Sequence, residues 1–260
     1  MGILNVTPDS FSDGGMYFDR KGAVERGLLI AREGADIIDV GGESTRPGAR
    51  PVAVEEELRR VIPVIEELCA RTDTPVSVDT SRARVAREAI EAGASLINDV
   101  MGTPVEREMA EVAARYEVPI VVMHMKGQPL TMQDDPSYDD LMGEIAAALS
   151  ESIATLERCG VAPGRIIIDP GIGFGKTAAH NIEIMRNLHV LRALCKPVLV
   201  GPSRKSFIGA ILGIANPAER VMGTAAAVTA AIAGGADIVR VHDVAAMSQV
   251  CRMADALYKR

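Results

Sequence analysis

Short apolar runs recur along the chain and alternate with longer stretches that have the apolar spacing of helices. Eight such runs can be read: GILNV, DIIDVGG, PVSVDT, SLINDV, PIVVMH, RIIIDPG, PVLVGPS and DIVRVHD. Their apolar residues are continuous and often β-branched instead of alternating with polar ones, which is typical of strands buried on both faces. The pattern therefore predicts a parallel sheet whose strands are connected by helices.

The stretches between the runs have the period of amphipathic helices. In residues 54–68 the apolar positions lie three or four apart, and residues 141–156 follow the same period. Pro63 lies inside the first of these helices and predicts a kink there. Gly-Ala precedes the runs in EGADIIDV, AGASLINDV and GGADIVRVHDV, where the glycine suits a helix C-cap.

Eight strand–helix units with this self-similarity predict a (β/α)₈ or TIM barrel, which forms a single domain over residues 1–260. The length agrees with the roughly 250 residues that one such barrel commonly takes. A doubly wound sheet is the alternative, but no Gly-x-Gly-x-x-Gly motif follows the first run. The active site of a barrel lies at the C-terminal ends of its strands, so the residues that close each run are the candidates.

The composition limits the kind of partner. The net charge is −7 without long blocks of one sign, which argues against nucleic acid or an anionic membrane. No apolar run is long enough to span a membrane, and there is no tryptophan on which bases could stack. The four cysteines show no C-x-x-C spacing, and the opening MGILNVTPDS lacks the basic region of a signal peptide. We therefore expect a cytoplasmic protein with reduced thiols and a small-molecule substrate.

Polar residues close nearly every run. In chain order they are Asn5, Asp39, Asp79, Asn98, His124, Asp169, Lys205 just past the seventh run, Arg240 and His242. Closing the ring of strands would bring them to one mouth, although for Asp39 and His124 a structural role weighs as much as a functional one. The set has neither the spacing of a metal site nor a nucleophile paired with a base. It predicts a pocket that hydrogen-bonds a polar heterocycle beside cations that bind an anion.

Glycine-rich loops adjoin these residues. Residues 5–15 and 41–49 read either as loops that order on an anionic substrate or as irregular surface loops. The stretch DPGIGFGKT ends like a phosphate loop, but Pro170 occupies the position at which the first glycine is required. Ser206 is predicted to be a helix N-cap, so that the helix end can receive a carboxylate or phosphate. Lys205 is either a Schiff-base lysine or a hydrogen-bonding cation.

Several motifs together resemble the dihydropteroate synthase family of pterin-binding barrels. They are MGILNVTPDSFSDGG, GADIIDVGGESTRPGA, SVDTSR, INDV, MHMKGQPLTMQ, DPGIGFGKT, GPSRKSF and RVHDV, and the resemblance runs from Gly2 to the last helix. It implies a folate-pathway enzyme that condenses 6-hydroxymethyl-7,8-dihydropterin diphosphate with 4-aminobenzoate to give 7,8-dihydropteroate and pyrophosphate. It also implies Mg²⁺ as cofactor, a homodimer and a sulfonamide target.

The resemblance implies roles for individual residues. The pterin would be bound by Asp79, Asn98, Asp169, Lys205 and Arg240. The pyrophosphate would be met by Asn5, Arg240 and His242, with Asn5 also contacting the metal. The 4-aminobenzoate would be bound by Thr45, Arg46, Pro47, Phe174 and Ser206, with Phe11 beside them. The residues expected to be catalytic are Asp79, Lys205, Arg240 and Arg46.

Two departures from the family pattern stand out. The chain begins almost inside the first strand, so we expect the segment beneath the barrel to be truncated or absent, and Pro202 replaces a smaller or hydroxylic residue.

Three other functions compete with the synthase. They are a non-catalytic pterin-binding paralogue, a corrinoid-linked methyltransferase that uses methyltetrahydrofolate, and an aldolase with Lys205 as Schiff base. Every motif residue expected of the synthase is present, which favours the synthase.

Overall fold

The computed structural model describes residues 1–7, 16–43, 52–100, 103–127, 131–134 and 136–258. Within these residues the chain forms eight strands, all parallel to their neighbours. They are β1 (Gly2–Asn5), β2 (Ile38–Gly41), β3 (Val76–Asp79), β4 (Leu96–Asp99), β5 (Ile120–Met123), β6 (Ile166–Asp169), β7 (Leu199–Val200) and β8 (Ile238–Val239). Each strand lies in one of the eight runs read from the sequence.

The strands close into a ring. β1 to β6 pair in chain order, and β7 pairs with β8. Single bridges join the two sheets, between Ile168 and Val198 on one side and between Gly2 and Val241 on the other. The second bridge carries a hydrogen bond from the Ile3 amide to the Val241 carbonyl at 2.9 Å. The predicted TIM barrel is therefore confirmed.

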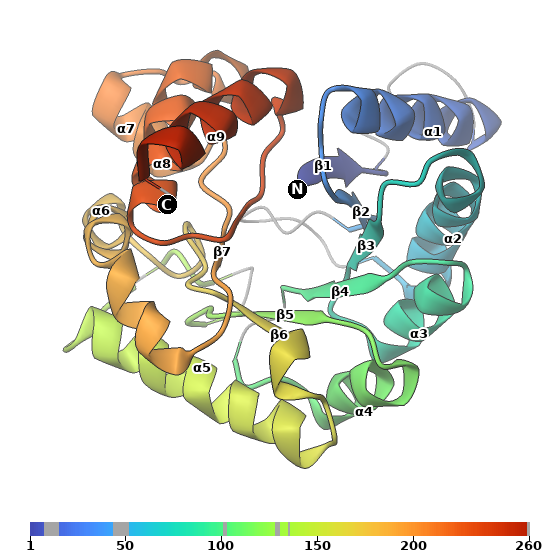
Figure 1. The fold of residues 1–260 in the computed structure, drawn as a ribbon, viewed down its shortest axis with the longest axis horizontal. Helices are drawn as coiled ribbons and strands as arrows, with labels where there is room; N and C mark the ends of the chain where they lie inside the picture. Colours follow the sequence, from blue (N-terminus) through green and yellow to red (C-terminus); the bar gives the residue numbers. More distant parts are fainter. Residues whose placement is uncertain (8–15, 44–51, 101–102, 128–130, 135, 259–260) are drawn as a thin grey trace.

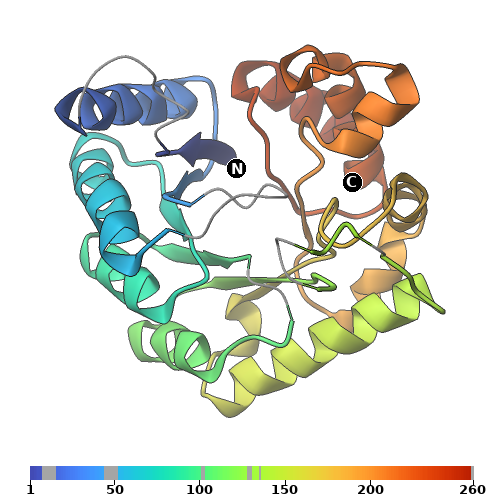
Figure 2. The same cartoon turned by 180° about the vertical axis from the view of Figure 1, so that it is seen from behind.

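Helices surround the ring of strands on the outside (Figures 1 and 2). They are α1 (Met16–Arg32), α2 (Val54–Arg71), α3 (Ala83–Glu91), α4 (Arg107–Tyr116), α5 (Leu141–Arg158), α6 (Ala178–Arg186), α7 (Ser206–Leu212), α8 (Val221–Ala233) and α9 (Val244–Tyr258). Short 3₁₀ turns lie at η2 (Pro163–Arg165), η3 (Leu188–Leu194) and η4 (Pro217–Glu219). The helices predicted over 54–68 and 141–156 are α2 and α5, and α2 continues through Pro63.

The Gly-Ala pairs before β2, β4 and β8 end the preceding helices as predicted. Gly34, Gly93 and Gly235 have φ values of 97°, 112° and 99°. A left-handed residue at this point reverses the chain after a helix, and glycine adopts that conformation without steric cost. The weak repeat in the sequence therefore marks one repeated turn of the barrel.

Strand side chains alternate between two apolar clusters. One cluster has members from strands all around the ring that contact one another, and so fills the barrel: Met1, Leu96, Val121, Ile167 and Leu199. The other lies between strands and helices and includes Leu4, Val40, Val78, Ile97 and Ile168. Asn98 and Asp169 follow Leu96 and Ile167 by two positions, so they project into the barrel at its C-terminal end, beyond the apolar layer.

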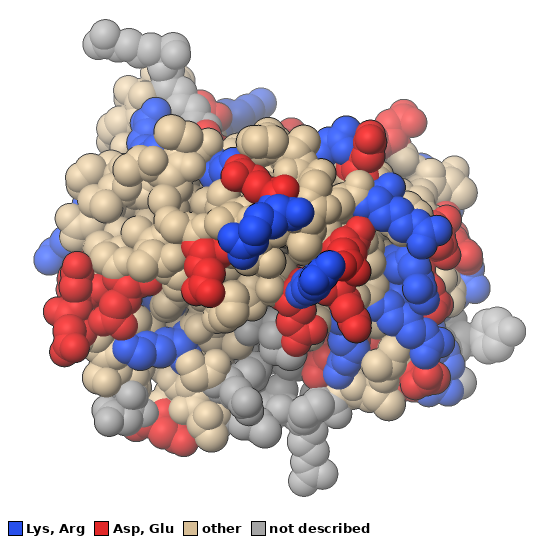
Figure 3. Space-filling model, turned by 90° about the horizontal axis from the view of Figure 1, so that it is seen from below, with Lys and Arg blue, Asp and Glu red and all other residues tan. Residues whose placement is uncertain are grey.

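The outer surface is mixed in charge where it is seen in Figure 3, with basic side chains interspersed among acidic ones. Among the helices that the structure describes, none is long and apolar enough to cross a membrane. None of the four cysteines, all within the described residues, forms a disulfide.

Candidate functional site

Asp39 joins three strands at the mouth of the barrel. This fully buried carboxylate of β2 accepts hydrogen bonds from the Ser77 hydroxyl, from Asn98 Nδ2 at 3.0 Å and from Arg240 Nε at 2.6 Å. In the strand register Asp39 lies beside Ser77, while Gly41 lies beside Asp79. Asp39 therefore lies deeper in the barrel than Asp79, which ends its strand. From there it hydrogen-bonds Asn98 and Arg240.

Arg240 bridges two buried carboxylates. Its Nη2 donates to Asp79 Oδ2 at 2.5 Å while its Nε donates to Asp39. Burial raises the pKa of Asp79 above its ordinary value, and the Arg240 charge opposes this rise. Burial also acts to lower the pKa of Arg240, but the two carboxylates outweigh it and raise that pKa above its usual value. The arrangement holds a permanent cation, 19% exposed, at the mouth.

Asp169, Lys205 and Phe174 form a second group at the mouth. Asp169 Oδ1 accepts a hydrogen bond from the Gly171 amide at 2.7 Å, and burial raises the pKa of Asp169 to about 6. Burial and the nearby Arg240 charge lower the pKa of Lys205 to about 8. The Lys205 ammonium lies 4.1 Å from the centre of the Phe174 ring, within cation–π range. The group combines a hydrogen-bond acceptor, a donor and an aromatic surface.

The glycines of DPGIGFGKT allow two loops to pack closely. Gly171 and Gly175 have φ values of 69° and 61°. A Cβ atom on Gly171 would lie 1.9 Å from the His124 carbonyl oxygen, and one on Gly175 would lie 2.2 Å from the Lys126 carbonyl oxygen. The loop after β6 therefore rests directly on the backbone of the loop after β5, which only glycine permits at these positions.

Lys176 is turned into the protein. It is 3% exposed, and its Nζ lies 2.9 Å from the Phe174 carbonyl oxygen and 2.9 Å from His124 Nδ1. Burial lowers the pKa of Lys176 to about 7, and burial together with Lys176 lowers the pKa of His124 to about 3. A neutral imidazole nitrogen can accept a hydrogen bond from the lysine ammonium. Lys176 therefore links the loop that carries Phe174 to His124 inside the protein and does not point towards a phosphate site.

The loops after β7 and β8 are linked by two side-chain pairs. His242 Nδ1 lies 3.0 Å from the Ser203 hydroxyl, and Arg204 binds Asp243 through two nitrogens at 2.5 and 2.9 Å. Burial and the Arg240 charge lower the pKa of His242 to about 3. These pairs hold the neutral His242 beside the loop that carries Lys205.

The prediction that Ser206 caps α7 is wrong. Lys205 is the N-cap, with extended backbone at φ −64° and ψ 155° and no side-chain cap bond, and Ser206 is the first helical residue. The cap is decided by the backbone of one residue, and the sequence pattern favoured the serine because it is the better capping residue. Ser206 is exposed next to Lys205.

The structure brings together most of the side chains predicted to bind the pterin. Asp79, Asn98 and Arg240 form one hydrogen-bonded network through Asp39, and Asn5 ends β1 in register with Gly41. Thr45, Arg46, Pro47 and Phe11 lie outside the described residues. The sequence placed Asp39 in the ring of polar residues, where a structural role weighed as much as a functional one, and the family resemblance assigned it no ligand. Fold and site define the class: a TIM barrel with a polar mouth of mixed charge.

Comparison with known proteins identifies the family. The model of the pterin binding enzyme family matches residues 1–242. The dihydropteroate synthase of Synechocystis sp. is 53% identical over 259 residues, which cover 100% of this chain and 90% of that protein. The chain therefore belongs to the pterin-binding enzymes and, within them, to the dihydropteroate synthase family.

Solved structures agree with this assignment over the whole chain. The Clostridium difficile dihydropteroate synthase, determined in the presence of pteroic acid, superposes with a TM-score of 0.94 at 46% identity, covering 100% of this chain and 96% of that one. The Xanthomonas albilineans enzyme with 4-aminobenzoic acid superposes with a TM-score of 0.93 at 48% identity, covering 100% and 93%.

Proposed function

We propose that this chain joins 6-hydroxymethyl-7,8-dihydropterin diphosphate to 4-aminobenzoate, giving 7,8-dihydropteroate and pyrophosphate. The observation that carries the proposal is the joint presence of buried carboxylates, an amide and two cations at one barrel mouth. Such a set offers acceptors for ring N–H groups, a donor for a ring carbonyl and positive charge for a leaving diphosphate. Membership of the dihydropteroate synthase family supports the same reaction.

Asp169, Asn98 and Asp79 recognise the pterin ring in this proposal. The Asp169 carboxylate accepts two parallel hydrogen bonds from the 2-amino group and N3–H, the geometry in which carboxylates bind most strongly. Asn98 and Asp79 bond other ring nitrogens, and Lys205 donates to the ring carbonyl. The hydrogen bonds through Asp39 support these roles, because they hold Asn98 and Arg240 in place before the substrate arrives.

Arg240 and His242 act on the leaving group. The bond between the exocyclic methylene carbon and the diphosphate oxygen breaks, and pyrophosphate leaves with the electron pair. The electron-rich dihydropterin supports the positive charge at that carbon. The 4-aminobenzoate nitrogen then forms the new C–N bond and gives up one proton to solvent. The protein contributes orientation and stabilisation of the departing anion, and Arg240 supports this role because it stays charged at every working pH.

Phe174, Ser206 and the segment 45–47 bind the second substrate in this proposal. Phe174 offers its ring to the benzoate, and its position beneath the Lys205 ammonium supports that contact next to the pterin. Ser206 is exposed beside Lys205 and can donate its hydroxyl to the benzoate carboxylate. Thr45, Arg46 and Pro47 would contact the same molecule.

Asn5 is the proposed protein ligand for Mg²⁺. Among the described residues no three His, Cys, Asp or Glu side chains gather as a metal site. Mg²⁺ usually takes one or two protein oxygens and completes its shell with water and substrate phosphates, so a single amide oxygen at the end of β1 fits. When bound, the ion would neutralise part of the diphosphate charge. Calorimetry of pyrophosphate binding with and without Mg²⁺ tests this, and Asn5→Ala should remove the difference.

A homodimer is proposed from an apolar face on α6, α7 and α8. A groove of about 360 Å³ there is lined by Met185, Phe207, Ile211, Gly223 and Ala227, among others. Ile211 is 59% exposed at this groove. Light scattering should give twice the mass of one chain for the wild type and the mass of one chain for Ile211→Asp. Leu257→Asp is the matched control, since Leu257 on α9 is 60% exposed. A wild-type monomer would contradict the proposal.

A cytoplasmic location is the last part of the proposal. It is supported by the four cysteines, none of which is in a disulfide, because disulfides are characteristic of proteins in oxidising compartments. Fractionation of cells that express the natural protein tests this location directly.

Pyrophosphate release decides between the synthase and its rivals. The dihydropterin diphosphate is incubated with the protein and Mg²⁺, with and without 4-aminobenzoate. Release that depends on 4-aminobenzoate, with an equal amount of dihydropteroate, is expected of the synthase. A non-catalytic paralogue would bind the pterin without release, and borohydride trapping on Lys205 would indicate an aldolase. Asp169→Ala should lose about 1.5–3 kcal/mol of pterin affinity by calorimetry.

A further inference from the structure

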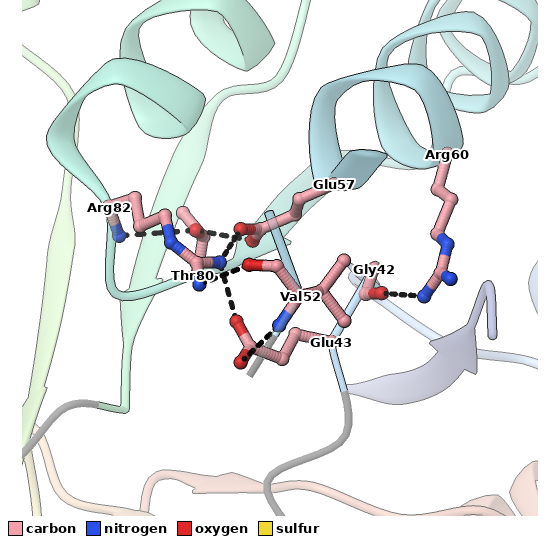
Figure 4. A network of polar contacts seen from close by, with 7 residues as sticks. All are labelled: Gly42, Glu43, Val52, Glu57, Arg60, Thr80 and Arg82. Carbon is pink, nitrogen blue, oxygen red and sulfur yellow. Dashed lines mark hydrogen bonds and ion pairs between the residues drawn. The ribbon is translucent and has the colours of Figure 1, made fainter. Parts of the chain in front are cut away.

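Arg82 lies at the centre of a polar network between β2, α2 and the loop that leads into α3 (Figure 4). Its guanidinium donates to Glu57, to Glu43 Oε2 at 2.5 Å and to the Val52 carbonyl at 2.6 Å. The Val52 amide donates in turn to Glu43 Oε1 at 3.2 Å. We call Arg82, Glu43, Glu57 and Val52 the Arg82 clamp.

The clamp holds both ends of one segment. Glu43 directly precedes residues 44–51 and Val52 directly follows them, and Arg82 binds both. A second arginine supports the first end, since Arg60 Nη1 donates to the Gly42 carbonyl at 2.9 Å. The separation and direction of the two ends are thus set by side chains from α2 and from the residue preceding α3.

The clamp is also tied to the pterin side of the mouth. Thr80 directly follows Asp79, and its hydroxyl donates to Glu57 Oε1 at 2.6 Å and accepts from the Arg82 amide at 3.2 Å. The ends of the segment 44–51 are therefore positioned relative to the strand that carries Asp79.

The charges of the clamp explain why an arginine is required. Glu57 is fully buried and Glu43 is 21% exposed, so two carboxylates face one guanidinium. Burial acts to lower the pKa of Arg82, but the bonds to Glu57 and the charge of Glu43 raise it above its usual value. The planar guanidinium reaches two carboxylates and a carbonyl at once, which a lysine ammonium on its flexible stem does not reproduce.

We propose that Arg82 is a positioning residue for the second substrate. It holds Glu43 and Val52, the two residues that flank the segment in which Thr45, Arg46 and Pro47 stand. The inference rests on the proposed function, in which those three residues bind 4-aminobenzoate. In this proposal Arg82 does not touch substrate, and its hydrogen bonds go to Glu43, Val52, Glu57 and Thr80 instead of to Asp169 or Arg240.

Steady-state kinetics and pterin binding test the inference. In Arg82→Gln and in Glu43→Ala the KM for 4-aminobenzoate should rise about tenfold or more, while the pterin Kd by calorimetry stays within about twofold. Glu43→Ala leaves the buried Glu57–Arg82 pair intact, so it reports on the segment even if Arg82→Gln fails to fold. Arg82→Lys keeps the positive charge but lacks the planar guanidinium, and its KM for 4-aminobenzoate should be intermediate.

Arg84→Gln is the matched control. Arg84 lies two residues on and also bridges α2 and α3, through Glu55 at 2.8 Å and Glu88 at 3.0 Å. It is 50% exposed, and these hydrogen bonds go to neither Glu43 nor Val52. Its kinetics should equal those of the wild type.

Each outcome is decisive. An unchanged KM for 4-aminobenzoate in folded Glu43→Ala overturns the inference, as does a pterin Kd that weakens in step with the KM, because both would mean a general structural role. A wild-type protein that makes no dihydropteroate refutes the proposed function instead. The two failures are therefore told apart by the wild-type assay.

Discussion

Replacing Asp169 by asparagine is expected to stabilise the unliganded protein and to weaken its affinity for a pterin. Asp169 is 7% exposed, and burial raises the pKa of its carboxyl from 3.8 to about 6. A raised carboxyl pKa means that the folded protein holds this proton more tightly than the unfolded chain does. At neutral pH the ionised carboxylate therefore lowers the free energy of unfolding.

The size of the effect follows from the shift. At about 1.4 kcal/mol per pKa unit, the buried charge costs roughly 3 kcal/mol. The amide oxygen of asparagine can still accept the Gly171 hydrogen bond, so little else is lost. The free energy of unfolding of Asp169→Asn should equal that of the wild type below about pH 4. Its excess over the wild type should grow up to about pH 6 and stay constant above that pH. Above about pH 6 the melting temperature should rise by about 6–12 °C, from roughly 2–4 °C per kcal/mol.

Urea unfolding at about pH 4 and about pH 8 measures the stability, with the exposed Asp134→Asn as control. Calorimetry should show pterin affinity falling about 10- to 150-fold in Asp169→Asn, as expected for one lost charge-assisted pair. An Asp169→Asn protein that is less stable than the wild type at pH 8, or whose stability difference is independent of pH, would mean that the buried carboxylate does not destabilise the fold. In that case Asp169 would bind the pterin without lowering the stability of the unliganded protein.

Asp39→Asn, which weakens the shared acceptor of Asn98 and Arg240, should lower the free energy of unfolding by about 2–3 kcal/mol in urea and reduce pterin affinity about tenfold by calorimetry. Since burial lowers the pKa of Lys205 to about 8, pterin affinity should fall above that pH as its charge is lost, and Lys205→Met should remove this dependence. The closed ring predicts one unfolding transition in scanning calorimetry, and two separable transitions would mean that the chain is not one domain.

Local patterns were sufficient for the strands and for most of the side chains proposed to bind the pterin. A parallel strand buried on both faces needs a continuous apolar run, so SLINDV and RIIIDPG identify themselves as strands without knowledge of their neighbours. The alternation of side chains then decides the rest, because a residue two positions after a barrel-filling residue must also face inward. Asn98 and Asp169 were predicted because they close their runs, and the alternation explains why they face inward. The Gly-Ala turns followed from glycine's left-handed backbone.

Other roles could not be read locally because they depend on partners far along the chain. Asp39 and Arg240 are 201 residues apart and meet only because the ring closes. Lys176 has the sequence context of a phosphate-binding lysine, yet close packing of two loops turns it onto His124.

The sequence by itself determined the barrel and the polar ends of its strands, since burial and turn conformation are written into neighbouring residues. Tertiary structure alone decided which charges pair. Glu57 and Arg82 lie on α2 and just before α3, and their contact depends on how those elements pack. A hydrogen bond acts over about 3 Å, so its partners are specified only once the packing has brought them to that distance.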